Sequence, residues 1–339
     1  MATGPGRLQA VAQLTRAPLF AVTFMFVLLG VAGSSGEVPA SDLALILVAS
    51  IGFHVAVYVV NDIVDLPIDR TEPRRATSPL VLGTVTPGRM AVVAAAAAVV
   101  GVGTAAVVAW SAGVAMACAT GLLIVYDVWG KRCALPPLTD LVQGLGWAAL
   151  LASGSLAGGG TTATTAWLGA YVVVAILLVN GVHGAVRDLA NDQRYGARTT
   201  ARFLGASVDA SGAFHLPVRL WVYGVVLHVV DVALLAVPLT TDESSRSVEL
   251  AVVVAGGVIG LVALGRGLHR AGDRRVALGA GFAYIIVMLA VPAALVAESL
   301  DGAVLVAMVV LFVGPWAGST FVRSTLSTGR SRLPDAVAQ

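Results

Sequence analysis

Two short acidic segments hold the residues of this sequence whose types and spacing could perform chemistry. The first, residues 61–70, reads NDIVDLPIDR, and the second, residues 187–192, reads RDLAND. On a helix, side chains three and four residues apart share a face, so the carboxylates of each segment would form a stripe and repel one another. A cation removes this repulsion, and Mg²⁺ prefers one or two carboxylates together with water and substrate phosphate oxygens. The spacing therefore predicts a site for Mg²⁺ and a diphosphate.

Arginines accompany both acidic segments. A diphosphate held through metal ions still needs Arg or Lys for its remaining oxygens, and Arg75 and Arg198 lie in the loops that follow the two segments. Charges at the helix ends of a membrane protein are often only solvated caps, which is the competing interpretation of either segment alone. Two segments with the same spacing, both flanked by arginine, favour a shared binding site. Pro67 can kink or end the first helix, which leaves the register of Asp69 open.

The composition indicates which elements position these segments. Hydrophobic residues make up 58% of the 339 residues and charged residues 12%, against about 25% charged residues in ordinary soluble domains. This number of charges is too small to cover a surface that faces water. We therefore expect the lipid bilayer to surround most of the chain. Spanning helices need roughly 20 apolar residues, and ten segments qualify, at about 17–34, 41–61, 89–109, 111–128, 138–157, 166–186, 219–239, 248–266, 275–297 and 302–321.

Basic residues then predict the orientation of the chain. With ten spans, all of the 21 Lys and Arg residues except Arg246 fall on one side, which the positive-inside rule makes cytoplasmic. We expect an all-α fold, a polytopic transmembrane helical bundle of nine to ten spans in the plasma membrane, with both termini and two Asp-rich loops in the cytoplasm. Residues 1–322 should form one membrane domain, and residues 323–339 a polar, disordered tail.

The acidic segments resemble those of the UbiA superfamily of intramembrane prenyltransferases, over about residues 15–300. The family's two motifs, N-D-x-x-D-x-x-x-D and D-x-x-x-D, are matched in order by Asn61, Asp62, Asp65, Asp69, Asp188 and Asp192. The stretch 126–131 is similar to the family's Tyr-then-Lys turn after the fourth helix. The family often has Arg-Pro-Leu after its first motif, where this chain has Ser78 before Pro79. One phosphate ligand would therefore be missing, or supplied by Arg74 or Arg75.

The resemblance assigns roles to individual residues. The catalytic aspartates, which would bind Mg²⁺, are Asp62, Asp65, Asp69, Asp188 and Asp192. The expected substrate-binding residues are Asn61, Arg75, Lys131, Asn180, Arg187, Arg198, Tyr58 and His54. The last two lie one and two turns before the first motif, where a π face could stabilise a carbocation, or they are ordinary helix-packing residues. Asn180 mirrors Asn61, because each lies in front of its own acidic motif.

By this resemblance, the expected activity is magnesium-dependent ionisation of an isoprenyl diphosphate, followed by prenyl transfer to an aromatic or other lipophilic acceptor. A terpene cyclase of the same superfamily begins with the same ionisation and is the alternative. A secondary transporter is a further alternative, although transporters keep their coupling residues near the bilayer midplane, whereas these carboxylates lie at helix ends. We expect no nucleic-acid partner.

One acid lies inside a predicted span. Asp231 follows His228 by one turn, about 12 residues into the segment 219–239. Ionisable residues inside the membrane are costly and are functional candidates. The pair is either structural, inside the bundle, or provides a base that removes a proton from an acceptor or a terminal cation.

Overall fold

The computed structural model describes residues 7–72, 75–237, 246–297 and 300–330, nearly all of them in helices. The longer helices are α2 (Phe20–Ala32), α3 (Ala40–Val64), α5 (Pro87–Val108), α6 (Trp110–Trp129), α7 (Pro136–Ala157), α8 (Ala163–Leu178), α12 (Val218–Ala236), α13 (Arg246–His269), α14 (Arg274–Val296) and α15 (Gly302–Arg330). The shorter helical elements are α1 (Arg7–Leu14), η1 (Ala17–Leu19), α4 (Leu66–Asp69), η3 (Gly130–Arg132), η4 (Val179–Gly184), α9 (Ala185–Arg187), α10 (Leu189–Tyr195) and α11 (Thr200–Phe203). A small antiparallel hairpin pairs β1 (Ser207–Val208) with β2 (Phe214–His215).

Each of the ten predicted spans coincides with one of the longer helices, so the predicted all-α membrane bundle is confirmed. Seven helices in the described part of the chain are long and apolar enough to cross a membrane. The apolar stretches Ala17–Ala32 and Gly302–Ala317 are shorter. The chain is therefore a multi-pass membrane protein, and the count of nine or ten spans stays a prediction.

The predicted division at residue 322 also stays a prediction. Helix α15 continues through that position to Arg330, and residues 331–339 of the expected polar tail lie outside the described residues.

Helix α2 lies in the interior of the bundle. Every residue from Ala21 to Val31 is buried, as expected for a helix that is apolar on all sides. Close contact with α7 depends on two glycines, because a Cβ atom on Gly30 would lie 1.9 Å from the Leu151 carbonyl oxygen, and one on Gly154 would lie 2.2 Å from that of Val27. Small residues of this kind let membrane helices approach closely.

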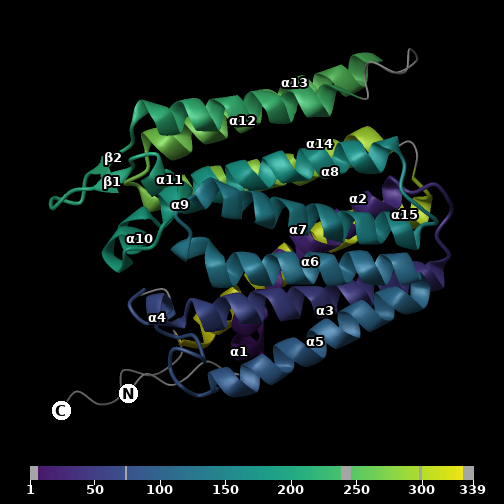
Figure 1. Cartoon of the computed structure of the whole chain (residues 1–339), viewed down its shortest axis with the longest axis horizontal. Coiled ribbons are helices and arrows are strands. Elements are labelled where there is room, and N and C mark those ends of the chain that lie inside the picture. The colour runs from purple at the N-terminus through teal and green to yellow at the C-terminus, as the bar shows by residue number, and fades with distance from the viewer. Residues whose placement is uncertain (1–6, 73–74, 238–245, 298–299, 331–339) are drawn as a thin grey trace.

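Both acidic segments lie at the same end of the bundle. Figure 1 shows α4, α9, α10 and α11 gathered there together with the hairpin. The first acidic segment is not one continuous helix, because α3 ends at Val64 and the short α4 begins at Leu66, with Pro67 in its first turn. Proline lacks an N–H group and its ring clashes with the preceding turn, which explains the break and places Asp69 on a separate helix.

The second acidic segment is interrupted in a similar way. Helix α8 runs into η4, a turn of π-helix, then into α9, and Asp188 separates α9 from α10. A π-turn inserts one residue into the helix and shifts which side chains share a face; such turns are frequent at functional sites. It brings Asn180 to one side of the helix and buries His183 on another.

Candidate active site

A cavity of about 410 Å³ opens between the two acidic segments. Its walls come from α3, α4, α6, η3, α7, η4, α9 and α10 and the loop before α11. The predicted site residues that line it are Tyr58, Asn61, Asp65, Asp69, Arg75, Lys131, Asn180, Arg187, Asp188, Asp192 and Arg198. Segments more than 100 residues apart in the chain thus contribute to one cavity. Of the predicted residues, Asp62 and His54 do not line it.

Two arginines hold the Asp62 side chain. Arg16 donates hydrogen bonds to the Asp62 carboxylate and to the Asn61 side-chain oxygen, the latter at 2.6 Å. Arg75 lies 3.4 Å from an oxygen of Asp62 and 3.4 Å from one of Asp69. The Asp62 side chain is only 4% exposed, so these cations compensate its charge behind the cavity wall.

Arg16 was not among the predicted site residues. It lines the cavity and lies over the ring of Tyr58, 5.3 Å from its centroid. Its backbone φ of 45° is in the left-handed region, which non-glycine residues rarely adopt. The sequence places it 45 residues before Asn61, so no local spacing could connect the two. Its one sequence signal is a cation directly before the first apolar segment.

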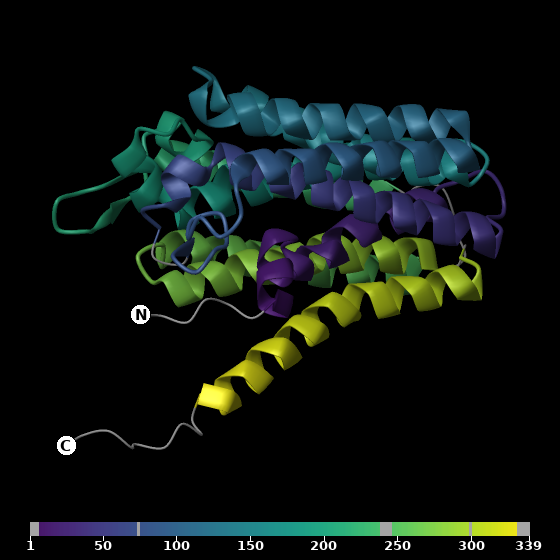
Figure 2. The same ribbon diagram turned by 90° about the horizontal axis from the view of Figure 1, so that it is seen from below.

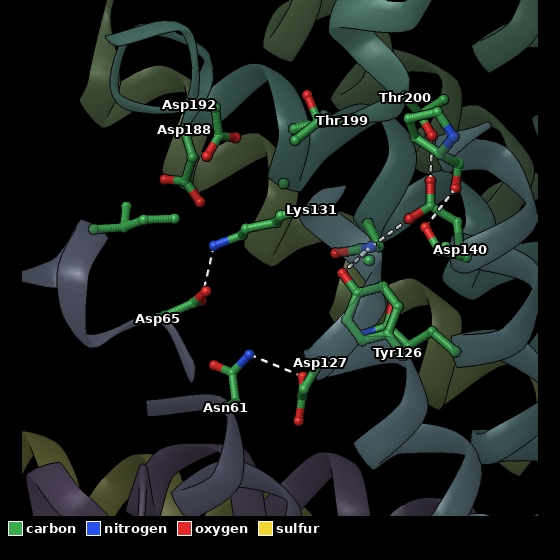
Figure 3. A pocket seen from close by; sticks show the side chains of 18 of the residues that line it. Asn61, Asp65, Tyr126, Asp127, Lys131, Asp140, Asp188, Asp192, Thr199 and Thr200 are labelled. Carbon is green, nitrogen blue, oxygen red and sulfur yellow. Dashed lines mark hydrogen bonds and ion pairs between the residues drawn. The ribbon is translucent and has the colours of Figure 1, made fainter. Parts of the chain in front are cut away.

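Asp127 in α6 and Lys131 in η3 both contact residues of the first acidic segment. Lys131 Nζ lies 2.8 Å from Asp65 Oδ2, and Asn61 Nδ2 donates to Asp127 Oδ1 at 2.9 Å. Asp127 was not predicted individually, although it lies within the Tyr-then-Lys stretch. The lysine therefore holds a carboxylate here and faces the second acidic segment, as Figure 3 shows.

The second acidic segment is less tightly paired. Arg187 contacts Asp188 at 2.5 Å, and Arg198 is exposed at the cavity with its backbone N–H donating to the Lys131 carbonyl oxygen at 2.9 Å. Burial raises the pKa of the Asp192 carboxyl to about 6, and burial also raises the pKa of Asp69. Removal from water disfavours a charged carboxylate, whereas a nearby cation favours it. These carboxyls therefore lie where a bound cation would stabilise their ionised form.

A second polar group lies farther inside the bundle. Asn180 Nδ2 donates to Tyr126 Oη at 2.6 Å and to Asp140 Oδ1 at 2.7 Å, and Thr200 donates to the other oxygen of Asp140. Figure 3 shows Tyr126, Asp140 and Thr200 together, away from the aspartates of the two motifs. Asp140 and Thr200 were missed, because a single acid at the start of α7 carries no repeated spacing.

His54 has a structural role. It is fully buried and its two ring nitrogens are hydrogen-bonded to the Thr23 hydroxyl at 2.7 Å and the Thr15 carbonyl oxygen at 2.8 Å. Its ring stacks on Phe20 at 3.8 Å. Helix packing therefore explains this residue, which was the second of the two interpretations that the sequence left open. Tyr58, by contrast, lines the cavity.

Asp231 and His228 lie away from the cavity and are not paired with each other. Tyr284 donates a hydrogen bond to Asp231 Oδ2 at 2.7 Å, and His228 Nε2 donates to the Gly257 carbonyl oxygen at 2.9 Å. Both side chains are buried in the bundle. Neither residue lines the cavity. Their burial agrees with the structural interpretation, but each residue is hydrogen-bonded to a partner other than the one expected.

The donor chemistry of the cavity fits Mg²⁺ bound together with a phosphate. All the carboxylates offer hard oxygen ligands, which magnesium prefers. Among the described residues, no three His, Cys, Asp or Glu side chains form a group that could hold a metal ion by themselves. Magnesium usually keeps water and phosphate ligands and needs only one or two carboxylates. The arrangement is thus suited to a metal ion that arrives with its diphosphate.

Comparison with known proteins identifies a related fold. The model of the UbiA prenyltransferase family matches residues 22–264, a range that includes both acidic segments. A UbiA homolog from Aeropyrum pernix K1 is 18% identical, with a TM-score of 0.64 over 84% of this chain and 98% of that one. A digeranylgeranylglyceryl phosphate synthase is 17% identical, with a TM-score of 0.63 over 86% and 98% of the two chains. A UbiA homolog from Archaeoglobus fulgidus bound to GPP and Mg²⁺ is 16% identical, with a TM-score of 0.63 over 84% and 99%. None of the curated proteins matches the sequence.

Proposed function

This chain belongs to the UbiA prenyltransferase family, and we propose that it ionises an isoprenyl diphosphate with Mg²⁺ and transfers the prenyl group to an aromatic or other lipophilic acceptor. The single observation that carries the proposal is the convergence of both acidic segments, with their arginines and Lys131, on one cavity. The related structure bound to GPP and Mg²⁺ supports the same ligand class.

The residues divide the work as follows in this proposal. Asp65, Asp69, Asp188 and Asp192 would hold Mg²⁺, with Asp62 behind them, and the ion would supply the positive charge that makes a diphosphate a better leaving group. Arg75, Arg187 and Arg198 donate to the remaining phosphate oxygens. Lys131 and Asn61 keep Asp65 and Asp127 in place. Tyr58 lines the cavity, where the part of its ring that Arg16 and His54 leave open would contact a developing allylic cation.

The inner wall of the cavity favours transfer over cyclisation. It carries the polar Asp127, Asp140, Gln143 and Asn180 as well as apolar and aromatic residues, namely Val57, Leu123, Tyr126 and Trp147. A cyclisation cascade needs an inert apolar surface around migrating cations, because a nearby carboxylate would remove a proton early. Polar groups at this depth are more readily explained as contacts to an acceptor.

A product assay tests the proposal. The purified protein is incubated with geranylgeranyl diphosphate and shorter isoprenyl diphosphates, with and without aromatic acceptors, and both released diphosphate and products are measured. We expect an acceptor adduct together with diphosphate. A free cyclic hydrocarbon would identify a terpene cyclase instead. No diphosphate release from any chain length would contradict both and would favour a transporter.

Arg75→Ala and Arg198→Ala should each lower kcat/KM for the diphosphate roughly ten- to hundredfold, since a charge-assisted hydrogen bond is worth about 1.5–3 kcal/mol. Arginine presents a planar fork to phosphate oxygens, and both side chains line the cavity. Arg270→Ala is the matched control, because Arg270 is exposed after α13 and does not line the cavity. Steady-state kinetics would check this. Equal damage from Arg270→Ala would contradict the assignment.

We also propose that the protein lies in the plasma membrane with both termini in the cytoplasm. A reporter that is active only in the periplasm should be silent when fused after residue 339, because Arg323, Arg330 and Arg332 resist transfer across the membrane. The same reporter inserted at residues 158–162, between α7 and α8, should be active. An active C-terminal fusion would mean that α15 does not span, and the nine-span alternative would replace ours.

A further inference from the structure

Most cations of the cavity contact the aspartates of the two motifs. Its cationic lining residues are Arg16, Arg75, Lys131, Arg187 and Arg198. Arg16, Arg75, Lys131 and Arg187 contact the aspartates of the two motifs, and Arg198 lies in the loop that follows the second motif. All five therefore belong to the end where a diphosphate would bind.

The inner side of the cavity that α7 forms carries no cation among the residues that the structure describes. Helix α7 leads inward from Pro136, so a rise of about 1.5 Å per residue places Gln143 roughly 10 Å and Trp147 roughly 16 Å deeper. The lining side chains on α7 and beside it are neutral or acidic: Leu123, Tyr126, Thr139, Asp140, Gln143 and Trp147.

The hydrogen bonds of this inner wall leave specific groups available. Both hydrogens of the Asn180 amide are used, one by Tyr126 Oη and one by Asp140 Oδ1. Tyr126 therefore accepts from Asn180 and keeps its own hydroxyl hydrogen for the cavity. Asp140 accepts from Asn180 and Thr200, so neutral donors alone compensate its charge in the described part of the chain.

Gln143 is the second available group. Its Oε1 atom is buried and has no hydrogen-bond partner among the residues that the structure describes. A buried polar atom without a partner is unfavourable, whereas a ligand with an O–H or N–H group would satisfy it. Tyr126 offers a donor and Gln143 an acceptor, and both residues line the cavity.

We propose that this inner wall is the acceptor site, and that it selects an uncharged acceptor bearing an O–H or N–H group over a carboxylated or phosphorylated one. The inference rests on the proposed function, since a cyclase would need no acceptor. An anionic group on the α7 side would meet Asp140, whose bonded partners in the described part of the chain are the neutral Asn180 and Thr200, and an unpaired buried charge is strongly unfavourable. A neutral acceptor instead satisfies Gln143 and the Tyr126 hydroxyl.

Equilibrium binding tests this without turnover. The full-length protein in lipid nanodiscs is saturated with Mg²⁺ and a geranylgeranyl thiodiphosphate that ionises poorly. Affinities are then measured for two matched pairs, 4-hydroxybenzamide against 4-hydroxybenzoate, and 1,4-dihydroxy-2-naphthamide against the corresponding naphthoate. We expect at least one amide to bind tenfold or more tightly than its carboxylate. Equal or tighter carboxylate binding, or no saturable binding of either amide, would overturn the inference.

Substitutions of Gln143 test whether the acceptor binds at this part of the cavity. Gln143→Leu should weaken amide binding at least tenfold, and Gln143→Arg should shift the preference toward the carboxylate by adding the missing cation. Gln193→Leu is the matched control, because Gln193 bonds the backbone of Val208 in the hairpin and does not line the cavity. An unchanged amide affinity in Gln143→Leu would overturn the placement.

The two proposals can fail separately. Binding of the thiodiphosphate with Mg²⁺ reports on the proposed function and also shows that each variant is folded. If the thiodiphosphate binds and the amide preference is absent, only the acceptor inference fails. If the thiodiphosphate does not bind to the wild-type protein, the proposed function fails first.

Discussion

Asp65→Asn and Asp188→Asn are each expected to reduce turnover below about a tenth of the wild-type rate, while the protein still inserts and folds. The two residues contribute carboxylates from opposite acidic segments to one cavity. Asparagine keeps the shape of the side chain but removes the charge that a metal ion requires, which should cost several kcal/mol of transition-state stabilisation. The measurement is the rate of diphosphate release by purified variants.

Asp42→Asn is the matched control for these variants. Asp42 lies in the first turn of α3, at the opposite end of the helix from Asp65, so its loss should leave the rate unchanged. The melting temperature of each variant would show that folding is intact. If Asp65→Asn or Asp188→Asn keeps more than about a tenth of the rate, a loss of only about 1.4 kcal/mol, that residue does not belong to the metal site.

Excess EDTA should abolish diphosphate release, and added Mg²⁺ should restore it better than other divalent ions. Hard oxygen ligands on both protein and diphosphate select a hard cation. Because the described residues contain no group of three side chains that could hold a metal alone, calorimetry should show weak Mg²⁺ binding without diphosphate and much stronger binding with a thiodiphosphate. Full activity in excess EDTA would rule out the proposed mechanism.

Periodicity was sufficient to predict the helices and to single out carboxylates of both acidic segments that line the cavity. Asp65 and Asp188 are found there because carboxylates at helical spacing, next to arginine, leave a local pattern in the sequence. The apolar segments likewise predicted where each longer helix would lie, since lipid requires a nearly continuous apolar run.

Contacts between segments that are far apart in the chain leave no such local pattern in the sequence. Arg16 joins the site only because the residues between α1 and η1 lie against α3, and Asp140 joins it only through Asn180 and Thr200. His54 shares a helix with the first motif, but its face is covered by Phe20 and Thr23. Sequence spacing predicts a shared helix face, but not which neighbouring helix covers that face.

The burial of α2 has a consequence for how the protein is made. Helix α15 packs against α2 and η1, and Figure 2 shows it running obliquely beneath the bundle toward the end that carries the acidic segments. The ribosome therefore produces one of the earliest apolar segments long before the helix that completes its surroundings. Until α15 has been synthesised and inserted, lipid or the insertion machinery must cover the part of α2 that α15 later contacts.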